Sequence, residues 1–133
     1  MHAVKRVRRR VSEAAEFCQV SDLMRVTIRN LSTGLRKRVA LADALLLRPR
    51  VLLLDDFLAG LDRDMRESTG VLLSNVAAFS SVIVTGHELE DFSKWTTRFQ
   101  FLKDGIVSST LETAGLSSEE LRERLALALR GEG

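Results

Sequence analysis

The sequence has few of the residues that mark disulfide-stapled or secreted proteins. Cys18 is the single cysteine, so a disulfide within the chain is excluded and a reducing compartment is expected. We expect Cys18 to act as a small, buried apolar residue. With 133 residues the chain is long enough to bury a core, either as one small domain or as part of a larger one.

Long hydrophobic runs are also missing. No stretch approaches the roughly 18 apolar residues that span a bilayer, because Asp43 and Arg48 interrupt the most hydrophobic region. The basic N-terminus is followed by Ser12, Glu13 and Glu16, where a signal peptide would have its apolar core. The net charge is only +2, and 45% of the residues are hydrophobic, a composition typical of globular proteins and not of disordered ones. We therefore expect a cytoplasmic chain.

One cluster of basic residues lies near the N-terminus and consists of Lys5, Arg6, Arg8, Arg9 and Arg10. Such a cluster can attract phosphates or anionic lipid. However, Val4, Val7 and Val11 recur between these charges at helical spacing, which favours the solvated face of an ordinary helix.

Hydrophobic spacing predicts three segments in the first fifty residues. A helix is expected over about 3–18, an irregular or partly helical connection over 23–30, and a helix over 35–47 that Pro49, the single proline, terminates. The apolar face of the helix at 35–47 is predicted to hold Val39, Ala42, Leu45 and Leu46, with Arg36, Lys37 and Arg38 pointing elsewhere.

The rest of the chain alternates between strand-like and helix-like patterns. The apolar run 51–54 suits a parallel strand covered on both faces, and 81–85 is a second buried strand. Helices are expected from the Asp62 cap to about residue 78, over 89–95, and after the Ser117 and Glu120 capping box to about residue 130. Strands at 98–103 and 106–109 are joined by the hairpin turn Asp104-Gly105.

This order of elements predicts an α/β fold. It reads β-α-β-α-β-β after the first helices, which indicates a mostly parallel sheet with right-handed crossovers and an antiparallel edge. Ligands of such sheets gather at the carboxyl ends of the parallel strands, where Asp55, Asp56 and His87 fall. A carboxylate there suits Mg²⁺, although an acidic pair after a strand is also an ordinary turn signal.

Five segments in a fixed order resemble the ATP-binding subunit of ABC transporters. Residues 31–42, LSTGLRKRVALA, resemble the ABC signature, and 51–56, VLLLDD, resemble the Walker B strand. They are followed by LAGLD at 58–62, similar to the D-loop, TGHE at 85–88, similar to the switch-histidine segment, and LKDGIV at 102–107, similar to the closing hairpin. The resemblance covers about residues 3–110 and implies the C-terminal portion of a P-loop NTPase fold.

The resemblance also implies roles for single residues. Asp55 would support Mg²⁺, Asp56 would stand at the general-base position, Asp62 would communicate across a dimer, and His87 would contact the γ-phosphate of ATP. The signature positions pressed against ATP held by a second subunit would be Leu31, Ser32, Thr33 and Gly34. A hydroxyl and unpaired N–H groups at a helix start do favour an anion, although simple helix capping explains Ser32 equally well.

The chain departs from the family pattern in several places. Thr33 replaces the usual first glycine of the signature and Leu35 the usual glutamine, while Asp56 stands where glutamate is typical and is one methylene shorter. No G-x-x-x-x-G-K-[ST] phosphate loop occurs, nor does the family glutamine loop. We expect the chain alone to be inactive toward ATP, and a truncated or split reading frame is the simplest account.

The predicted function follows from the resemblance. The complete subunit would couple binding and hydrolysis of ATP, with Mg²⁺, to transmembrane transport. Its partners would be a second ATPase subunit and transmembrane permease subunits, without direct contact with nucleic acid, at the inner face of the cell membrane. Residues 1–50 would be part of the helical subdomain, 51–112 the C-terminal half of the ATPase core, and 113–133 a C-terminal helix.

Two other interpretations remain open. The chain could be a non-catalytic module that docks onto an intact ATPase and contributes Ser32 and Gly34 to a composite site. It could instead belong to an ABC-type ATPase of DNA repair or chromosome organisation, for which the basic N-terminus offers slight support.

Overall fold

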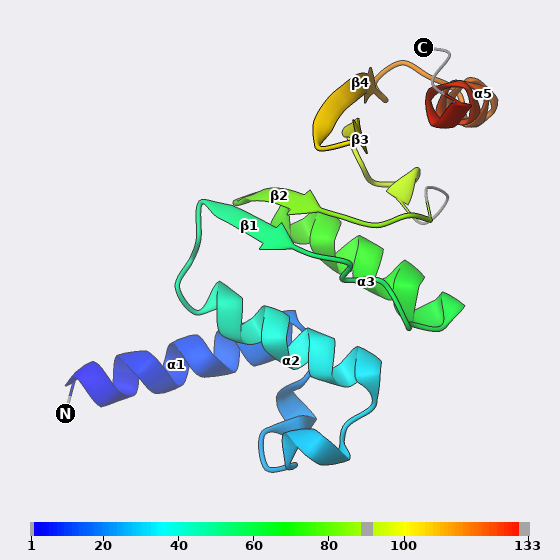
Figure 1. Ribbon diagram of the computed structural model, residues 1–133. Coiled ribbons are helices and arrows are strands. Elements are labelled where there is room, and N and C mark those ends of the chain that lie inside the picture. Colours follow the sequence, from blue (N-terminus) through cyan, green and yellow to red (C-terminus); the bar gives the residue numbers. More distant parts are fainter. Residues whose placement is uncertain (1, 89–91, 131–133) are drawn as a thin grey trace. The chain divides into compact units, whose positions relative to one another are not determined.

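The computed structural model describes residues 2–88 and 92–130, and the chain divides into two compact units, 1–87 and 88–133. The first unit contains α1 (His2–Phe17), the 3-10 helices η1 (Ser21–Leu23) and η2 (Ile28–Asn30), α2 (Thr33–Leu45), β1 (Val51–Leu54), α3 (Arg63–Val76) and β2 (Ser81–Val84) (Figure 1). The second contains β3 (Arg98–Lys103), β4 (Ile106–Glu112) and α5 (Ser118–Arg130). The predicted α/β class is confirmed, and the three-part division of the chain stays a prediction. None of the described helices is long and apolar enough to cross a membrane.

Helix α2 lies against α1, and its buried face shares Ala42 and Leu45 with the predicted one. The buried residues of α2 are Gly34, Arg38, Leu41, Ala42 and Leu45. The prediction that Arg38 points away from the core is wrong, because its side chain is buried and its guanidinium donates to Gln19 Oε1 and Ser68 Oγ, both at 2.6 Å. A buried guanidinium needs such partners, and these two link the end of α1 and the middle of α3 to α2.

Cys18 has the role expected from the sequence. It is fully buried, and this burial raises the pKa of its thiol to about 11, although the nearby positive charge of Arg38 acts in the opposite direction. The residue is therefore a protonated, unreactive thiol at neutral pH and contributes only packing.

The sheet of the first unit is a parallel pair. Strand β1 pairs with β2 in the register Val51↔Ser81 to Leu54↔Val84, and α3 forms the crossover along one face of the pair (Figure 1). Leu52 and Leu54 are buried, whereas Leu53 is 70% exposed. The prediction that β1 is covered on both faces is therefore wrong, since no described element of this unit covers the second face. The prediction that the second strand is buried is wrong for the same reason, because no residue of β2 is buried and Ile83 is 56% exposed.

The second unit is built on a hairpin. Strands β3 and β4 form their own antiparallel sheet, and Asp104 (φ 52°) and Gly105 (φ 78°) both adopt the left-handed conformation that a tight two-residue turn requires. The predicted capping box is confirmed, since Ser117 N donates to Glu120 Oε2 at 2.8 Å and Glu120 N to Ser117 Oγ at 3.2 Å. These bonds lower the pKa of Glu120. Of the helix predicted over 89–95, residues 89–91 lie outside the described part of the chain.

Candidate functional site

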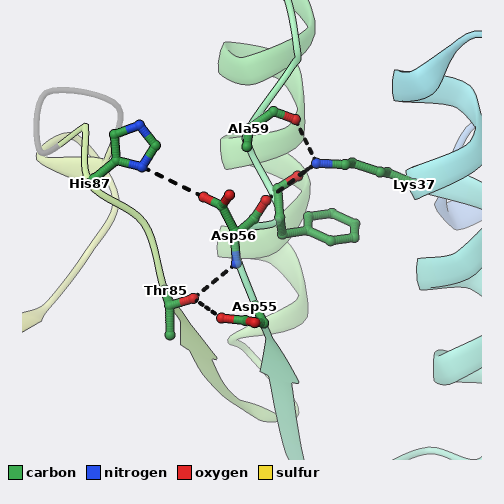
Figure 2. Close-up of polar contacts among 7 residues, drawn as sticks. Lys37, Asp55, Asp56, Ala59, Thr85 and His87 are labelled. Carbon is green, nitrogen blue, oxygen red and sulfur yellow. Dashed lines mark hydrogen bonds and ion pairs between the residues drawn. The ribbon is translucent and has the colours of Figure 1, made fainter. Parts of the chain in front are cut away.

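The site lies where the two parallel strands end. Because Leu54 pairs with Val84, the next residues of the two strands, Asp55 and Thr85, emerge side by side. Thr85 Oγ1 donates to Asp55 Oδ1 at 2.5 Å and accepts from the backbone N–H of Asp56 at 2.9 Å (Figure 2). One hydroxyl therefore orients the first carboxylate and anchors the backbone of the second. The sequence pattern placed Thr85 in this segment without indicating that it joins the two acids.

Asp56 and His87 face each other at the tip of this edge (Figure 2). His87 Nδ1 lies 3.7 Å from Asp56 Oδ1, and the two side chains are 76% and 56% exposed. Asp56 has a φ of 47°, a left-handed conformation that aspartate and asparagine tolerate better than most residues. The structure thus brings together the three residues that the sequence predicted at the strand ends.

The signature segment forms the start of α2. Ser32 is the N-cap, since its Oγ accepts from the backbone N–H of Leu35 at 3.3 Å. Ser32 and Thr33 are exposed and Leu31 is buried, so the two hydroxyl-bearing residues lie at the surface while Leu31 holds the turn to the core. Backbone N–H groups at a helix start, next to a hydroxyl, suit an anionic ligand.

Gly34 is required by packing. A Cβ added to Gly34 would lie 2.7 Å from Cγ of Met65 on α3, closer than side-chain carbons approach. We therefore expect Gly34→Ala to lower the free energy of unfolding by about 1 kcal/mol, because an overpacking cost of about 1–3 kcal/mol exceeds the gain of about 1 kcal/mol in helix propensity. Urea unfolding of the chain measures this change.

A second background controls for the cause. In chains that carry Met65→Ala the clash is absent, so Gly34→Ala is expected to become stabilising by about 1 kcal/mol. The same loss of stability in both backgrounds would show that Met65 is not the reason for glycine at this position.

Asp62 caps the next helix. Its Oδ1 accepts from Met65 N at 2.8 Å and its backbone oxygen accepts from Arg66 N at 2.9 Å. Gly60, with a φ of 72°, turns the chain toward this cap. The structure accounts for Asp62 as an ordinary N-cap, and a further role across a dimer stays a proposal.

The two acids fit a magnesium site in which the protein supplies only one or two of the ligands. Within the part of the chain that the structure describes, no group of three His, Cys, Asp or Glu residues could hold a metal ion by itself. Mg²⁺ commonly takes one or two carboxylates, several waters and substrate phosphates. Asp55, oriented by Thr85 at an exposed strand end, suits that pattern as a single ligand, direct or through water.

Comparison with known proteins agrees with the geometry. The family model described as "ABC transporter" matches residues 4–59. A putative ABC transporter ATP-binding protein of Streptomyces coelicolor is 35% identical over 124 residues, which are 92% of this chain and 44% of that protein. The chain belongs to the ABC transporter ATP-binding family.

Further ABC proteins are similar in sequence and in fold. The cobalt import ATP-binding protein CbiO of Rhodobacter capsulatus is 34% identical over 125 residues, 93% of this chain and 43% of that protein. An ABC transporter cassette solved in its ADP conformation has the same fold, with a TM-score of 0.79 at 19% identity over 91% of this chain and 46% of that chain. A dimeric bacterial ABC transporter cassette gives a TM-score of 0.70 at 28% identity, over 82% of this chain and 48% of that chain.

The match to ABC proteins is partial in length. The chain spans less than half of the curated relatives it matches, 44% of the Streptomyces protein and 43% of CbiO. It therefore corresponds to part of an ABC nucleotide-binding domain.

Proposed function

We propose that this chain supplies the signature and the magnesium and base positions of an ABC transporter ATPase subunit, which couples ATP hydrolysis to transport across a membrane. The observation that carries the proposal is the meeting of Asp55, Asp56 and His87 at the ends of two parallel strands. The same unit also holds a helix start capped by Ser32. The resemblance of five segments to the family motifs supports it.

Asp55 is the proposed magnesium ligand. The hydrogen bond from Thr85 fixes one carboxylate oxygen and keeps the side chain extended from the strand end. Hard cations such as Mg²⁺ take oxygen ligands of this kind. When bound, Mg²⁺ would neutralise charge on the phosphates of ATP. The hydroxyl of Thr85 orients the carboxylate toward that position.

Asp56 is the proposed base. Its carboxylate stands at the exposed tip of the site, where it can polarise a water molecule. The His87 ring lies beside this carboxylate, with Nδ1 at 3.7 Å from Oδ1. His87 is the proposed contact of the γ-phosphate, so its ring would also fix the distance between that phosphate and Asp56. Such positioning by a neighbouring residue is part of general-base catalysis.

The start of α2 is proposed to serve ATP held by a second ATPase subunit. Ser32, Thr33 and Gly34 would present a hydroxyl and backbone N–H groups to that phosphate, and Leu31 would hold the turn in place. Asp62 would lie at the same dimer interface. The assembled subunits would work with transmembrane permeases at the cytoplasmic face of the membrane.

Nucleotide binding tests the proposal directly. Without a phosphate-binding loop, the isolated chain is expected to bind ATP no more tightly than about millimolar in calorimetry. Fusion to a phosphate-loop-bearing N-terminal half of an ABC ATPase is expected to give micromolar, Mg²⁺-dependent binding and hydrolysis, because the fusion joins the missing donors to Asp55 and Asp56.

The matched control is the same fusion carrying Asp55→Asn, which should bind ATP with a much weaker dependence on Mg²⁺. Saturable micromolar binding of Mg-ATP by the isolated chain would contradict the proposal. The proposal would also be contradicted if the folded fusion bound ATP with the same Mg²⁺ dependence whether residue 55 is aspartate or asparagine.

A further inference from the structure

Lys37 reaches from α2 to the loop that carries Asp56. It lies on the second turn of α2, and its Nζ donates to the backbone oxygens of Ala59 at 2.6 Å, Phe57 at 2.8 Å and Asp56 at 3.3 Å (Figure 2). An ammonium group has three donors and no acceptor. Lys37 therefore has a carbonyl partner for each of its N–H bonds, all from one short loop.

The backbone of that loop is shaped to receive a cation. Asp56 and Gly60 both have positive φ values, 47° and 72°, and three carbonyl oxygens of the turn between them accept from Lys37. The buried side chains of Phe57 and Leu58 anchor the loop to the core. The ring centroid of Phe57 also lies 5.8 Å from the ammonium nitrogen of Lys37. Charge-assisted hydrogen bonds are stronger than neutral ones, and partial burial of Lys37 adds to this effect.

The same two segments also meet at a second point. A Cβ added to Gly60 would lie 4.0 Å from Cγ2 of Thr33, so the end of the loop lies against the first turn of α2. The helix start and the Asp56 loop are thus joined at two places. A shift of the helix must either carry the loop with it or break the contacts of Lys37.

We propose that Lys37 is a positioning residue that fixes the Asp56 loop to helix α2. Through Lys37, a shift of the helix start caused by a phosphate bound at Ser32 and Thr33 moves the loop that holds the Asp56 carboxylate. The catalytic meaning rests on the proposed function: the helix start serves ATP held by one subunit and Asp56 serves ATP held by the other, so Lys37 connects the two nucleotide sites of a dimer.

Amide hydrogen exchange of the isolated chain tests the connection without any nucleotide. Lys37→Met keeps most of the stem and removes all three donors. We expect exchange at the turn amides of Ala59 and Leu61 to become about tenfold faster, because their hydrogen bonds to Asp56 O and Leu58 O depend on the loop conformation. Exchange in the middle of α3 should stay unchanged, and Lys37→Arg, which retains charge and donors, should restore slow exchange.

Lys5→Met is the matched control, since it removes one exposed lysine of the same unit and should leave all of these rates unchanged. Unchanged exchange at Ala59 and Leu61 in Lys37→Met would overturn the proposal. A uniform acceleration across the first unit would also overturn it, because it would show a general loss of stability. Where Lys37→Met fails to fold, Lys37→Gln, with two donors, is expected to give an intermediate rate and decides the question.

The fusion ATPase separates positioning from simple packing. In it, Lys37→Met is expected to lower kcat by about tenfold and to change KM for ATP by less than about twofold, with recovery in Lys37→Arg. An unchanged kcat would remove the catalytic part of the proposal. A fusion that binds no Mg-ATP would instead refute the proposed function, while the exchange rates of the isolated chain would still decide whether Lys37 holds the loop.

Discussion

In the fusion ATPase, Asp56→Asn is expected to slow hydrolysis of bound ATP by about 10²- to 10⁴-fold without greatly changing ATP affinity, which is the range that a positioned general base contributes. The substitution preserves shape, and asparagine tolerates the left-handed backbone at φ 47° as well as aspartate does. The loss therefore reports chemistry and not folding. Single-turnover hydrolysis at saturating ATP measures it, with nucleotide affinity determined separately.

Two further substitutions sharpen this test. Asp56→Glu restores the longer side chain typical of the family, about 1.5 Å of reach, and is expected to accelerate hydrolysis where geometry limits the rate. Glutamate pays a strain of about 1 kcal/mol at this positive φ, so stability should fall slightly as the rate rises. His87→Ala should slow the chemical step. If Asp56→Glu is no faster and Asp56→Asn hydrolyses normally, Asp56 has a structural role only.

The features predicted correctly from the sequence are those set by local patterns. The run at 51–54 and the run at 81–85 each have strand length and end in polar residues, and parallel pairing then brings Asp55, Asp56 and His87 to one edge. Asp62 and Ser117 were predicted as caps from residue type and position alone, and both accept the expected backbone hydrogen bonds. These features depend on periodicity and on bonds that span three or four residues.

The features that the sequence did not reveal depend on partners far along the chain. Arg38 has the sequence appearance of a solvated charge, yet it is buried because Gln19 and Ser68 supply acceptors from two other elements. Thr85 and Lys37 likewise act on residues about twenty to thirty positions away. A helical pattern indicates which face is apolar, but it does not indicate where a long polar side chain finds its acceptors.

The uncovered face of the β1–β2 pair is expected to cause self-association of the isolated chain. Val51, Leu53 and Ile83 are 53%, 70% and 56% exposed on neighbouring strands, and parallel strands are normally covered on both faces. We expect the isolated chain to self-associate and to bind apolar dyes through this face. Leu53→Thr combined with Ile83→Thr retains strand propensity but removes the apolar surface. The pair should weaken association by at least about 100-fold, from about 1.5–3 kcal/mol for each large side chain. Light scattering over a concentration series measures the association.

Val7→Thr combined with Val71→Thr is the control, because Val7 on α1 and Val71 on α3 are 60% and 55% exposed and lie outside this face. This control should leave association and dye binding unchanged, so that a difference between the two double variants reports position and not the number of apolar residues. Free strand edges remain in all of them, and backbone pairing along an edge does not need apolar side chains. Association that persists equally in the Leu53 and Ile83 double variant would therefore assign self-association to the edges. A monomeric wild-type chain with one sharp unfolding transition and no dye binding would show that this face drives no association.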